Sequence, residues 1–281
     1  MSRPVSEPPM SYDLHTTART HVGKVRDNNE DSYVVRGSLL LVADGMGGHE
    51  AGEIASELTA ASFQQIADTD PDSDLTVPLR DAVERATHAI ASRIADEPEL
   101  AGMGTTLTAV LFGNRRIVVA NIGDSRLYVY HHDRRELVQV TKDDSFVQLM
   151  VDTGEITQDE AQHHPYRNVM LKALNGDEVE ARFTTLTGLS GDRYLLCSDG
   201  LTDYVERDDI RTALEIESLD EAADRLIELT LEAGAPDNVT VVLAELVPAG
   251  SDDGRVSVGS GDTGQHGVVD VPPTEPIPTH E

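Results

Sequence analysis

The stretch "LLLVADGMGGH" (Leu39–His49) decides the fold, because in it a wholly apolar run ends in an acidic, glycine-rich turn. Leu39 to Ala43 are all apolar, which indicates a strand that is covered on both faces. Asp44 follows at once, and a carboxylate at the end of a buried strand is costly unless a cation compensates its charge. The stretch therefore predicts a packed sheet with an anionic rim.

Carboxylates stand at the ends of hydrophobic strands elsewhere in the chain as well. They occur in "RDNNEDSY" (26–33), "NIGDSR" (121–126), "YLLCSDG" (194–200) and, with the acid before the strand, in "GAPDNVTVVLAEL" (234–246). The sequence has no His/Cys cluster beside them. Several carboxylates of this kind favour a hard divalent cation that prefers oxygen ligands, either Mg²⁺ or Mn²⁺.

The composition limits the possible functions. The chain has 281 residues, enough for one large domain or two small ones, and no Trp, so its core must consist mainly of Val, Leu, Ile and Ala. Its 51 acidic and 22 basic residues give a net charge of −29, which argues against nucleic acid as a partner and against a metal-dependent nuclease.

The single cysteine, Cys197, excludes an internal disulfide and lies in an apolar run, where a buried thiol is expected. No apolar leader and no run of about 18 apolar residues is present, so we expect no membrane segment and a cytoplasmic protein.

The order of predicted elements indicates the architecture. Strands are expected at 12–20, 31–35, 39–43, 105–112, 116–122, 126–132, 178–186, 193–200 and 238–246, and helices at 50–67, 77–96, 206–215 and 219–234. This order does not alternate regularly, which argues against a parallel sheet. It favours an α+β fold: a four-layer α-β-β-α sandwich of two antiparallel sheets flanked by helix pairs.

The chain also divides by composition. We expect a flexible N-terminal arm at residues 1–9, a catalytic domain at 10–248 and a disordered acidic tail at 249–281, where Gly, Ser, Asp, Pro and Thr dominate. The polar stretch at about 143–178 is expected to form an inserted surface flap.

The glycine-rich turn after Asp44 also has a simpler interpretation. It lacks the Gly-Lys-Ser/Thr ending of a phosphate-binding loop and the Gly-x-Gly-x-x-Gly fingerprint. Taken alone, it would be a tight turn with a helix-capping carboxylate.

Read together, six short motifs change this interpretation. "RDNNED", "ADGMGGH", "GTT", "NIGDSR", "CSDG" and "PDNVT" follow one another in the order found in the metal-dependent protein phosphatases of the type 2C family. The resemblance runs from Tyr12 to Val247 and is closest to bacterial members that oppose Ser/Thr kinases. It implies a phosphoserine/phosphothreonine phosphatase that acts on phosphorylated proteins, with a Ser/Thr kinase as its counterpart. We expect it to be a monomer.

The resemblance implies two Mn²⁺ or Mg²⁺ ions and a third, weaker one. Asp44 would bridge the ion pair and take part in catalysis, while Asp199 and Asp237 would hold the first ion. The carbonyl of Gly45 would hold the second ion, with Glu30 and Asp31 acting through water.

Three further residues complete the implied site. Asp124 would hold the third ion, which shares Asp199, with Asn168 as a marginal contributor. Arg26 would be the catalytic and substrate-binding arginine, because a guanidinium can grip two phosphoryl oxygens at once.

A hydroxide between the paired ions would attack phosphorus directly. Met46 replaces the histidine that serves many eukaryotic members as proton donor. His49 is not assigned that role, and a metal-bound water is the default donor.

Two alternatives keep the same fold. A catalytically weak pseudophosphatase would bind phosphoproteins and would have lost a ligand, but Arg26, Asp44, Asp199 and Asp237 are all present. A signalling phosphatase dedicated to one antagonist protein would use identical chemistry, but its usual sensory regions are not visible in the sequence.

Overall fold

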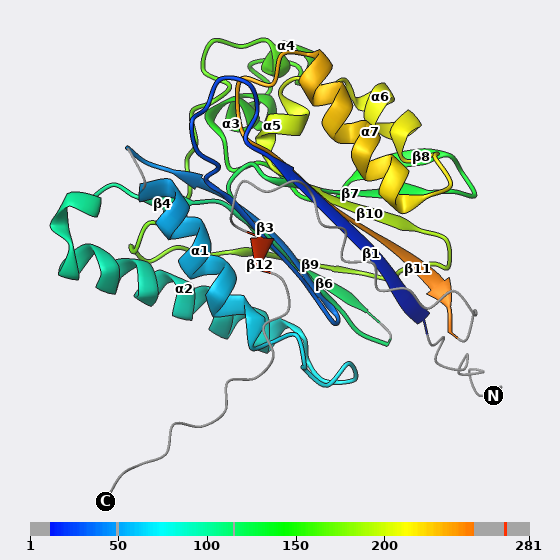
Figure 1. The fold of residues 1–281 in the computed structure, drawn as a ribbon, viewed down its shortest axis with the longest axis horizontal. Coiled ribbons are helices and arrows are strands. Elements are labelled where there is room, and N and C mark those ends of the chain that lie inside the picture. The colour runs from blue at the N-terminus through cyan, green and yellow to red at the C-terminus, as the bar shows by residue number, and fades with distance from the viewer. Residues whose placement is uncertain (1–11, 49–50, 115, 250–266, 269–281) are drawn as a thin grey trace, which may run out of the picture.

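Two β-sheets lie face to face at the centre of the computed structural model, and helices cover the outer face of each sheet (Figure 1). The structure describes residues 12–48, 51–114, 116–249 and 267–268. The predicted arm at 1–9 and nearly all of the predicted tail at 249–281 lie outside these residues. The layers confirm the predicted α+β class and the four-layer α-β-β-α sandwich.

The first sheet joins strands from both ends of the folded chain. Its antiparallel order is β1 (Tyr12–His21), β11 (Val239–Pro248), β10 (Arg193–Cys197), β7 (Arg126–His131) and β8 (Glu136–Gln139). Helices α6 (Arg207–Ala213) and α7 (Leu219–Glu232) cover its outer face (Figure 1). The predicted apolar side of α7 packs there, with Ala222 and Leu226 fully buried.

The second sheet contains the apolar strand that ends in Asp44 and the glycine-rich turn. Its order is β12 (Gly267–Val268), β2 (Asp31–Arg36), β3 (Leu39–Met46), β5 (Leu107–Phe112), β6 (Ile117–Ile122) and β9 (Arg182–Leu186), and β4 (Gly104–Thr105) also pairs with β3. Helices α1 (Ala51–Gln64) and α2 (Thr76–Asp96), followed by a 3-10 turn at Pro98–Leu100, cover its outer face.

Both faces of β3 are buried, as its unbroken apolar run predicts. Leu39, Leu41 and Ala43 pack under the α1/α2 layer, whereas Leu40 and Val42 point into the interface between the sheets. This alternation follows from the period of two residues in a strand. The same burial holds for all of β5 and β6.

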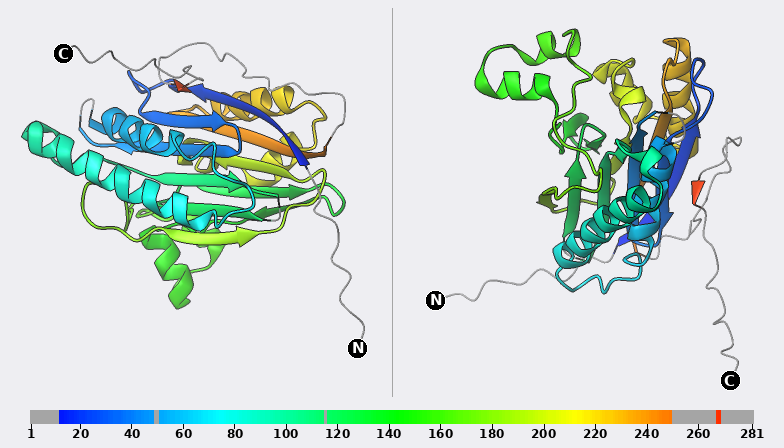
Figure 2. Two further views of the ribbon diagram at one scale, coloured as in Figure 1. Left: turned by 90° about the horizontal axis from the view of Figure 1, so that it is seen from below. Right: turned by 90° about the vertical axis from the view of Figure 1, so that its left-hand side faces the viewer.

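The predicted flap projects from the sandwich and carries α3 (Phe146–Thr153) and α4 (Gln158–Gln162) (Figure 2). Both short helices are stabilised by their own residues. Ser145 accepts a hydrogen bond from the Gln148 amide, and Thr157 and Glu160 form a capping box. The flap therefore has local order of its own.

Four details differ from the predictions. Strand β8 and the short helix α5 (Asp199–Thr202) were not predicted, and the strand expected at 105–112 is interrupted at Thr106. The tail was predicted to lack structure, yet Gly267–Val268 form the two-residue strand β12. Within the described residues, the pairing of β12 with β2 is the one parallel pairing.

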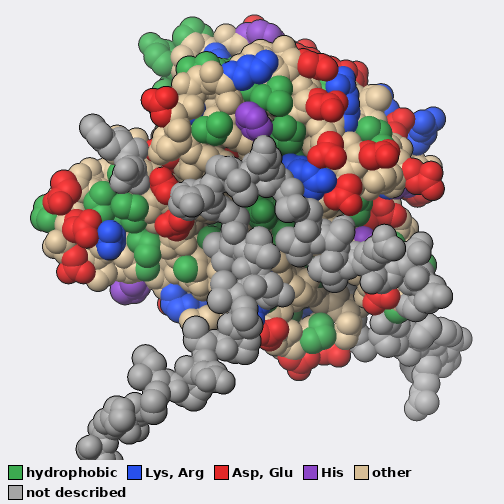
Figure 3. All heavy atoms as spheres, in the orientation of Figure 1, with side chains coloured by type: hydrophobic (Ala, Val, Ile, Leu, Met, Phe, Trp, Pro, Cys, Tyr) green, Lys and Arg blue, Asp and Glu red, His purple; other side chains and the backbone are tan. Residues whose placement is uncertain are grey.

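The surface reflects the acidic composition. Asp and Glu side chains are scattered over the face shown in Figure 3, with Lys and Arg between them. Among the described residues, no helix has the length and apolar character needed to cross a bilayer.

Replacing Phe63 tests the packing between the helices and the second sheet. Phe63 is fully buried in α1, so Phe63→Ala should lower the free energy of unfolding by about 3–5 kcal/mol through lost contacts and a cavity. Val77→Ala in α2 is the control, because Val77 is 47% exposed and its loss should cost no more than about 0.5 kcal/mol. Equal urea denaturation midpoints for the two variants would contradict this packing.

Candidate metal centre

The predicted carboxylates converge on one rim of the sandwich. Asp31 lies directly opposite Asp44 in the β2–β3 register. Asp199 follows β10 and Asp237 precedes β11, and these two strands are antiparallel neighbours, so their ends meet. Asp44 interacts electrostatically with Asp31, Asp124, Asp199 and Asp237. The structure thus brings together acids that are far apart in the sequence.

Close backbone contacts at the rim require glycine. A Cβ atom on Gly45 would lie 2.2 Å from the carbonyl oxygen of Gly52, and one on Gly200 would lie 1.8 Å from that of Asn238. Larger residues would push these segments apart. A Cβ on Gly52 would also lie 2.7 Å from Glu30 Oε2, which places the Glu30 carboxylate beside the first turn of α1.

One asparagine fastens the loop that carries Arg26 and Glu30. The Asn238 amide group donates to the carbonyls of Val22 and Asn28, both at 2.9 Å, and its oxygen accepts from the Glu30 amide at 2.8 Å. Asn238 was not predicted as a site residue, although it lies in the "PDNVT" motif.

Burial makes the ionised carboxylates unfavourable. Desolvation, followed by repulsion from neighbouring carboxylates, raises the pKa of Asp44 and of Asp199 well above the usual value. Desolvation also raises the pKa of Asp31 to about 6 and that of Asp124 to about 7. A divalent cation would reverse this penalty by compensating several negative charges at once.

Unpaired oxygen atoms support the same interpretation. Asp31 Oδ2 accepts a hydrogen bond from Ser198 Oγ at 2.8 Å, but Asp31 Oδ1 and Asp124 Oδ1 are buried without a hydrogen-bond partner. Buried anionic oxygens without donors are the ligand type that Mg²⁺ and Mn²⁺ prefer. The donor set therefore fits the predicted ions.

The carboxylates do not form a complete ligand cage. Within the described part of the chain, no group of three or more His, Cys, Asp or Glu side chains is arranged to hold an ion by itself. Backbone carbonyls and water would therefore have to supply much of the coordination. Such mixed coordination is common for Mg²⁺, which keeps several of its waters.

Arg26 lies beside these acids. Its Nη2 donates to Asp237 Oδ2 at 2.9 Å, and its side chain is 49% exposed. Desolvation lowers the pKa of Arg26, but the charge and hydrogen bond of Asp237 outweigh this effect and raise it overall. The exposed guanidinium has further N–H groups that a phosphate could accept from.

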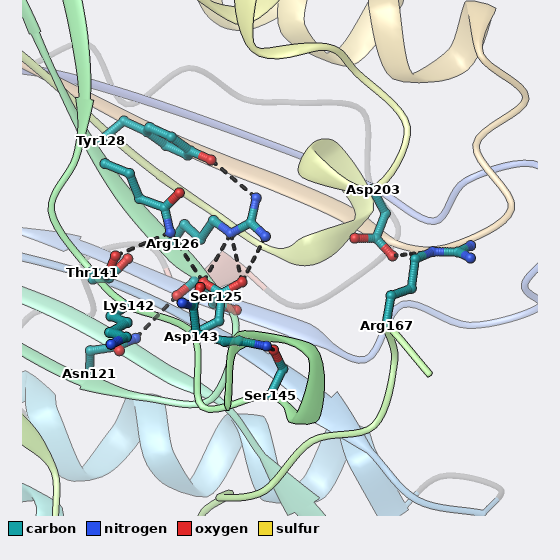
Figure 4. Close-up of polar contacts among 12 residues, drawn as sticks. Asn121, Ser125, Arg126, Tyr128, Thr141, Lys142, Asp143, Ser145, Arg167 and Asp203 are labelled. Carbon is teal, nitrogen blue, oxygen red and sulfur yellow. Dashed lines mark hydrogen bonds and ion pairs between the residues drawn. The ribbon is translucent and has the colours of Figure 1, made fainter. Parts of the chain in front are cut away.

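A cavity of about 400 Å³ opens between the flap and α5. Its lining includes Asp124, Asp199 and Asn168, the three residues predicted around a third ion. Asp203 also lines it, and Arg167 of the flap forms an ion pair with Asp203 at 3.6 Å (Figure 4). Asp203 was not predicted, although it follows Asp199 by four residues, the spacing of one helical turn.

Arginines from both sheets hold the base of the flap. Arg126 in β7 makes a forked contact with Asp143, with its Nη2 2.7 Å from Oδ2 (Figure 4). Arg182 in β9 contacts the Asp144 carboxylate at 3.3 Å and donates to the Lys142 carbonyl at 2.9 Å. These anchors were also not predicted.

Met46 is half-buried at the end of β3, and His49 lies outside the described residues.

Comparison with known proteins connects this geometry to a family. The family model described as protein phosphatase 2C matches residues 20–245. The chain is 51% identical over 234 residues to the serine/threonine protein phosphatase PstP of Mycobacterium tuberculosis, covering 83% of this chain and 45% of that protein. The chain therefore spans about half the length of this relative.

Two further matches cover nearly the whole of the other protein. The serine/threonine phosphatase Stp of Listeria welshimeri is 35% identical over 83% of this chain and 96% of its own length. A crystal structure of the PstP catalytic domain, in complex with two manganese ions, matches with a TM-score of 0.79 and 49% identity, over 84% of this chain and all of that one.

Asp199→Asn tests whether the rim carboxylates bind a cation. Because burial and neighbouring acids disfavour the Asp199 charge, the neutral amide should leave the melting temperature without metal equal to or above that of the wild type. Mn²⁺ should raise the melting temperature of the wild type and raise that of Asp199→Asn much less. Equal Mn²⁺-induced shifts in differential scanning calorimetry would remove Asp199 from the ligand set.

Proposed function

The chain belongs to the protein phosphatase 2C family, and from this premise we propose that it is a metal-dependent protein serine/threonine phosphatase. The observation that carries the proposal is the convergence of Asp44, Asp199 and Asp237 with Arg26 at one rim. A cation site beside an exposed guanidinium provides the two elements that a phosphomonoester requires: charge compensation and orientation.

The rim residues have separate roles in this proposal. Asp44 would serve both of two ions, with Asp199 and Asp237 as further ligands of the first and the Gly45 carbonyl as a ligand of the second. Glu30 and Asp31 would act through water. Asp124 and Asp199 would hold a third, weaker ion at the cavity that Asn168 also lines.

The two ions, Mn²⁺ or Mg²⁺, would supply a hydroxide at neutral pH for direct attack on phosphorus. Arg26 holds the phosphoryl oxygens in a forked geometry, and the carboxylates keep the site's charge close to balance. No side chain needs to form a covalent phosphoenzyme. The buried Cys197 has no exposed surface and a pKa raised by desolvation to about 12, so it does not serve as a nucleophile.

The biological setting follows from the same assignment. We infer that the substrates are proteins phosphorylated by a Ser/Thr kinase, that residues 10–248 form the catalytic domain and that the enzyme is a cytoplasmic monomer. The alternative of a phosphoprotein-binding pseudophosphatase is less well supported, because the residues proposed for the ions and the phosphate are all present and close together.

Mn²⁺-dependent turnover is the direct test of the proposed activity. The protein should hydrolyse p-nitrophenyl phosphate and phosphothreonine peptides with Mn²⁺, and EDTA should abolish both reactions. Arg26→Lys should raise KM more than it lowers kcat, because an ammonium keeps the charge but loses the forked contact. Binding of phosphopeptides without hydrolysis would favour the pseudophosphatase.

Removal of residues 249–281 tests the proposed domain boundary. The truncated protein should hydrolyse p-nitrophenyl phosphate with the kcat and KM of the full chain, because the rim residues all lie before the deleted segment. A severalfold loss of kcat would show that the catalytic unit extends into the tail.

A further inference from the structure

Two consecutive threonines clamp the backbone of Asp44. Thr105 Oγ1 and the Thr106 amide both donate to the Asp44 carbonyl, at 2.9 and 2.8 Å. The Asp44 amide donates in turn to Thr106 Oγ1 at 2.9 Å. Thr106 lies in the interruption between β4 and β5. The Asp44 amide therefore donates to the Thr106 side chain and not to a backbone carbonyl of the neighbouring strand.

The hydroxyl of Thr106 also reaches the segment that carries Asp124. Thr106 Oγ1 and Ser125 Oγ are 2.7 Å apart, and both residues are 1% exposed. The Ser125 carbonyl accepts from Thr108 Oγ1 at 2.7 Å and from the Asn121 side-chain amide at 3.1 Å. Asn121 and Ser125 lie together at the end of β6 and the turn that follows (Figure 4). One buried hydroxyl thus links the Asp44 peptide to the residue after Asp124.

Thr105 of this pair also forms hydrogen bonds with the C-terminal end of the flap. The backbone of Thr105 exchanges two hydrogen bonds with Leu174, both at 2.9 Å. At the other end of the flap, the Asp144 amide donates to the Gly123 carbonyl at 2.9 Å. The Gly104–Thr106 segment is therefore connected to Asp44, to the Asp124 turn and to the flap.

We propose that Thr106 is a positioning residue whose hydroxyl fixes Asp44 relative to Asp124 and so sets the affinity of the centre for its ions. The proposal rests on the proposed function, because it assigns these carboxylates to divalent cations. Its physical basis is the burial of the link: Thr106 and Ser125 are each 1% exposed, so solvent has little access to replace Thr106 Oγ1.

Thr106→Val tests the hydroxyl at nearly constant volume. The variant keeps the two bonds to the Asp44 carbonyl but leaves the Asp44 amide without its acceptor, so the sheet should persist while the carboxylate moves. Mn²⁺ affinity, measured by isothermal titration calorimetry without substrate, should fall roughly 10-fold or more. The Mn²⁺ concentration for half-maximal turnover should rise in parallel.

Three companion variants separate positioning from general destabilisation. Thr106→Ser keeps the hydroxyl and should restore Mn²⁺ affinity close to that of the wild type. Ser125→Ala breaks the link from the other side and should weaken Mn²⁺ binding in the same direction. Thr230→Val removes a buried hydroxyl that donates to the Leu226 carbonyl within α7, and it should leave Mn²⁺ affinity unchanged.

The outcomes distinguish this proposal from the proposed function. Wild-type Mn²⁺ affinity in Thr106→Val or in Ser125→Ala would overturn the positioning role while leaving the phosphatase assignment intact. A loss in Thr106→Val that Thr106→Ser does not restore would also overturn it, because the hydroxyl would then not be the cause. A wild-type protein that neither binds Mn²⁺ nor hydrolyses phosphate esters would contradict both the positioning role and the phosphatase assignment.

Discussion

Repulsion between desolvated carboxylates is the constraint on which the rest of this structure depends. Asp44 lies in β3 of one sheet and Asp199 follows β10 of the other, and Asp199 raises the cost of ionising Asp44 in a desolvated rim. The sandwich must hold them together against that repulsion. It does so with apolar packing on both sides of β3 and with contacts at Gly45 and Gly200 that leave no room for a side chain.

Neutral hydrogen bonds, rather than opposite charges, fix two of these acids, Asp31 and Asp44. Ser198 holds Asp31, and Thr105 and Thr106 hold the Asp44 peptide. Arginines stand at the edges instead: Arg26 pairs with Asp237 and Arg126 with Asp143. Neutral donors and acceptors define position without neutralising the centre, so its negative charge remains available to a cation.

Much of the fold and site could be predicted from the sequence, for a physical reason. Strands covered on both faces have unbroken apolar runs, and an acid at the end of such a run is visible without a structure, as at Asp44 and Asp199. Asp203, Asn238 and the Arg126–Asp143 pair could not be assigned in this way, because their roles depend on contacts between distant segments. The interruption of the strand at Thr106 could not be predicted either, because the residues on both sides of it have the character of one continuous strand.

The flap combines firm anchors with a self-contained interior. Arg126 from one sheet and Arg182 from the other hold Asp143 and Asp144, whereas the helices beyond them are capped by their own residues. Substitutions at exposed positions of the helical part can therefore accumulate without disturbing these anchors. Sequence change at the exposed surface of the flap and preservation of the rim geometry are thus separable, because the two lie on opposite sides of one pair of aspartates.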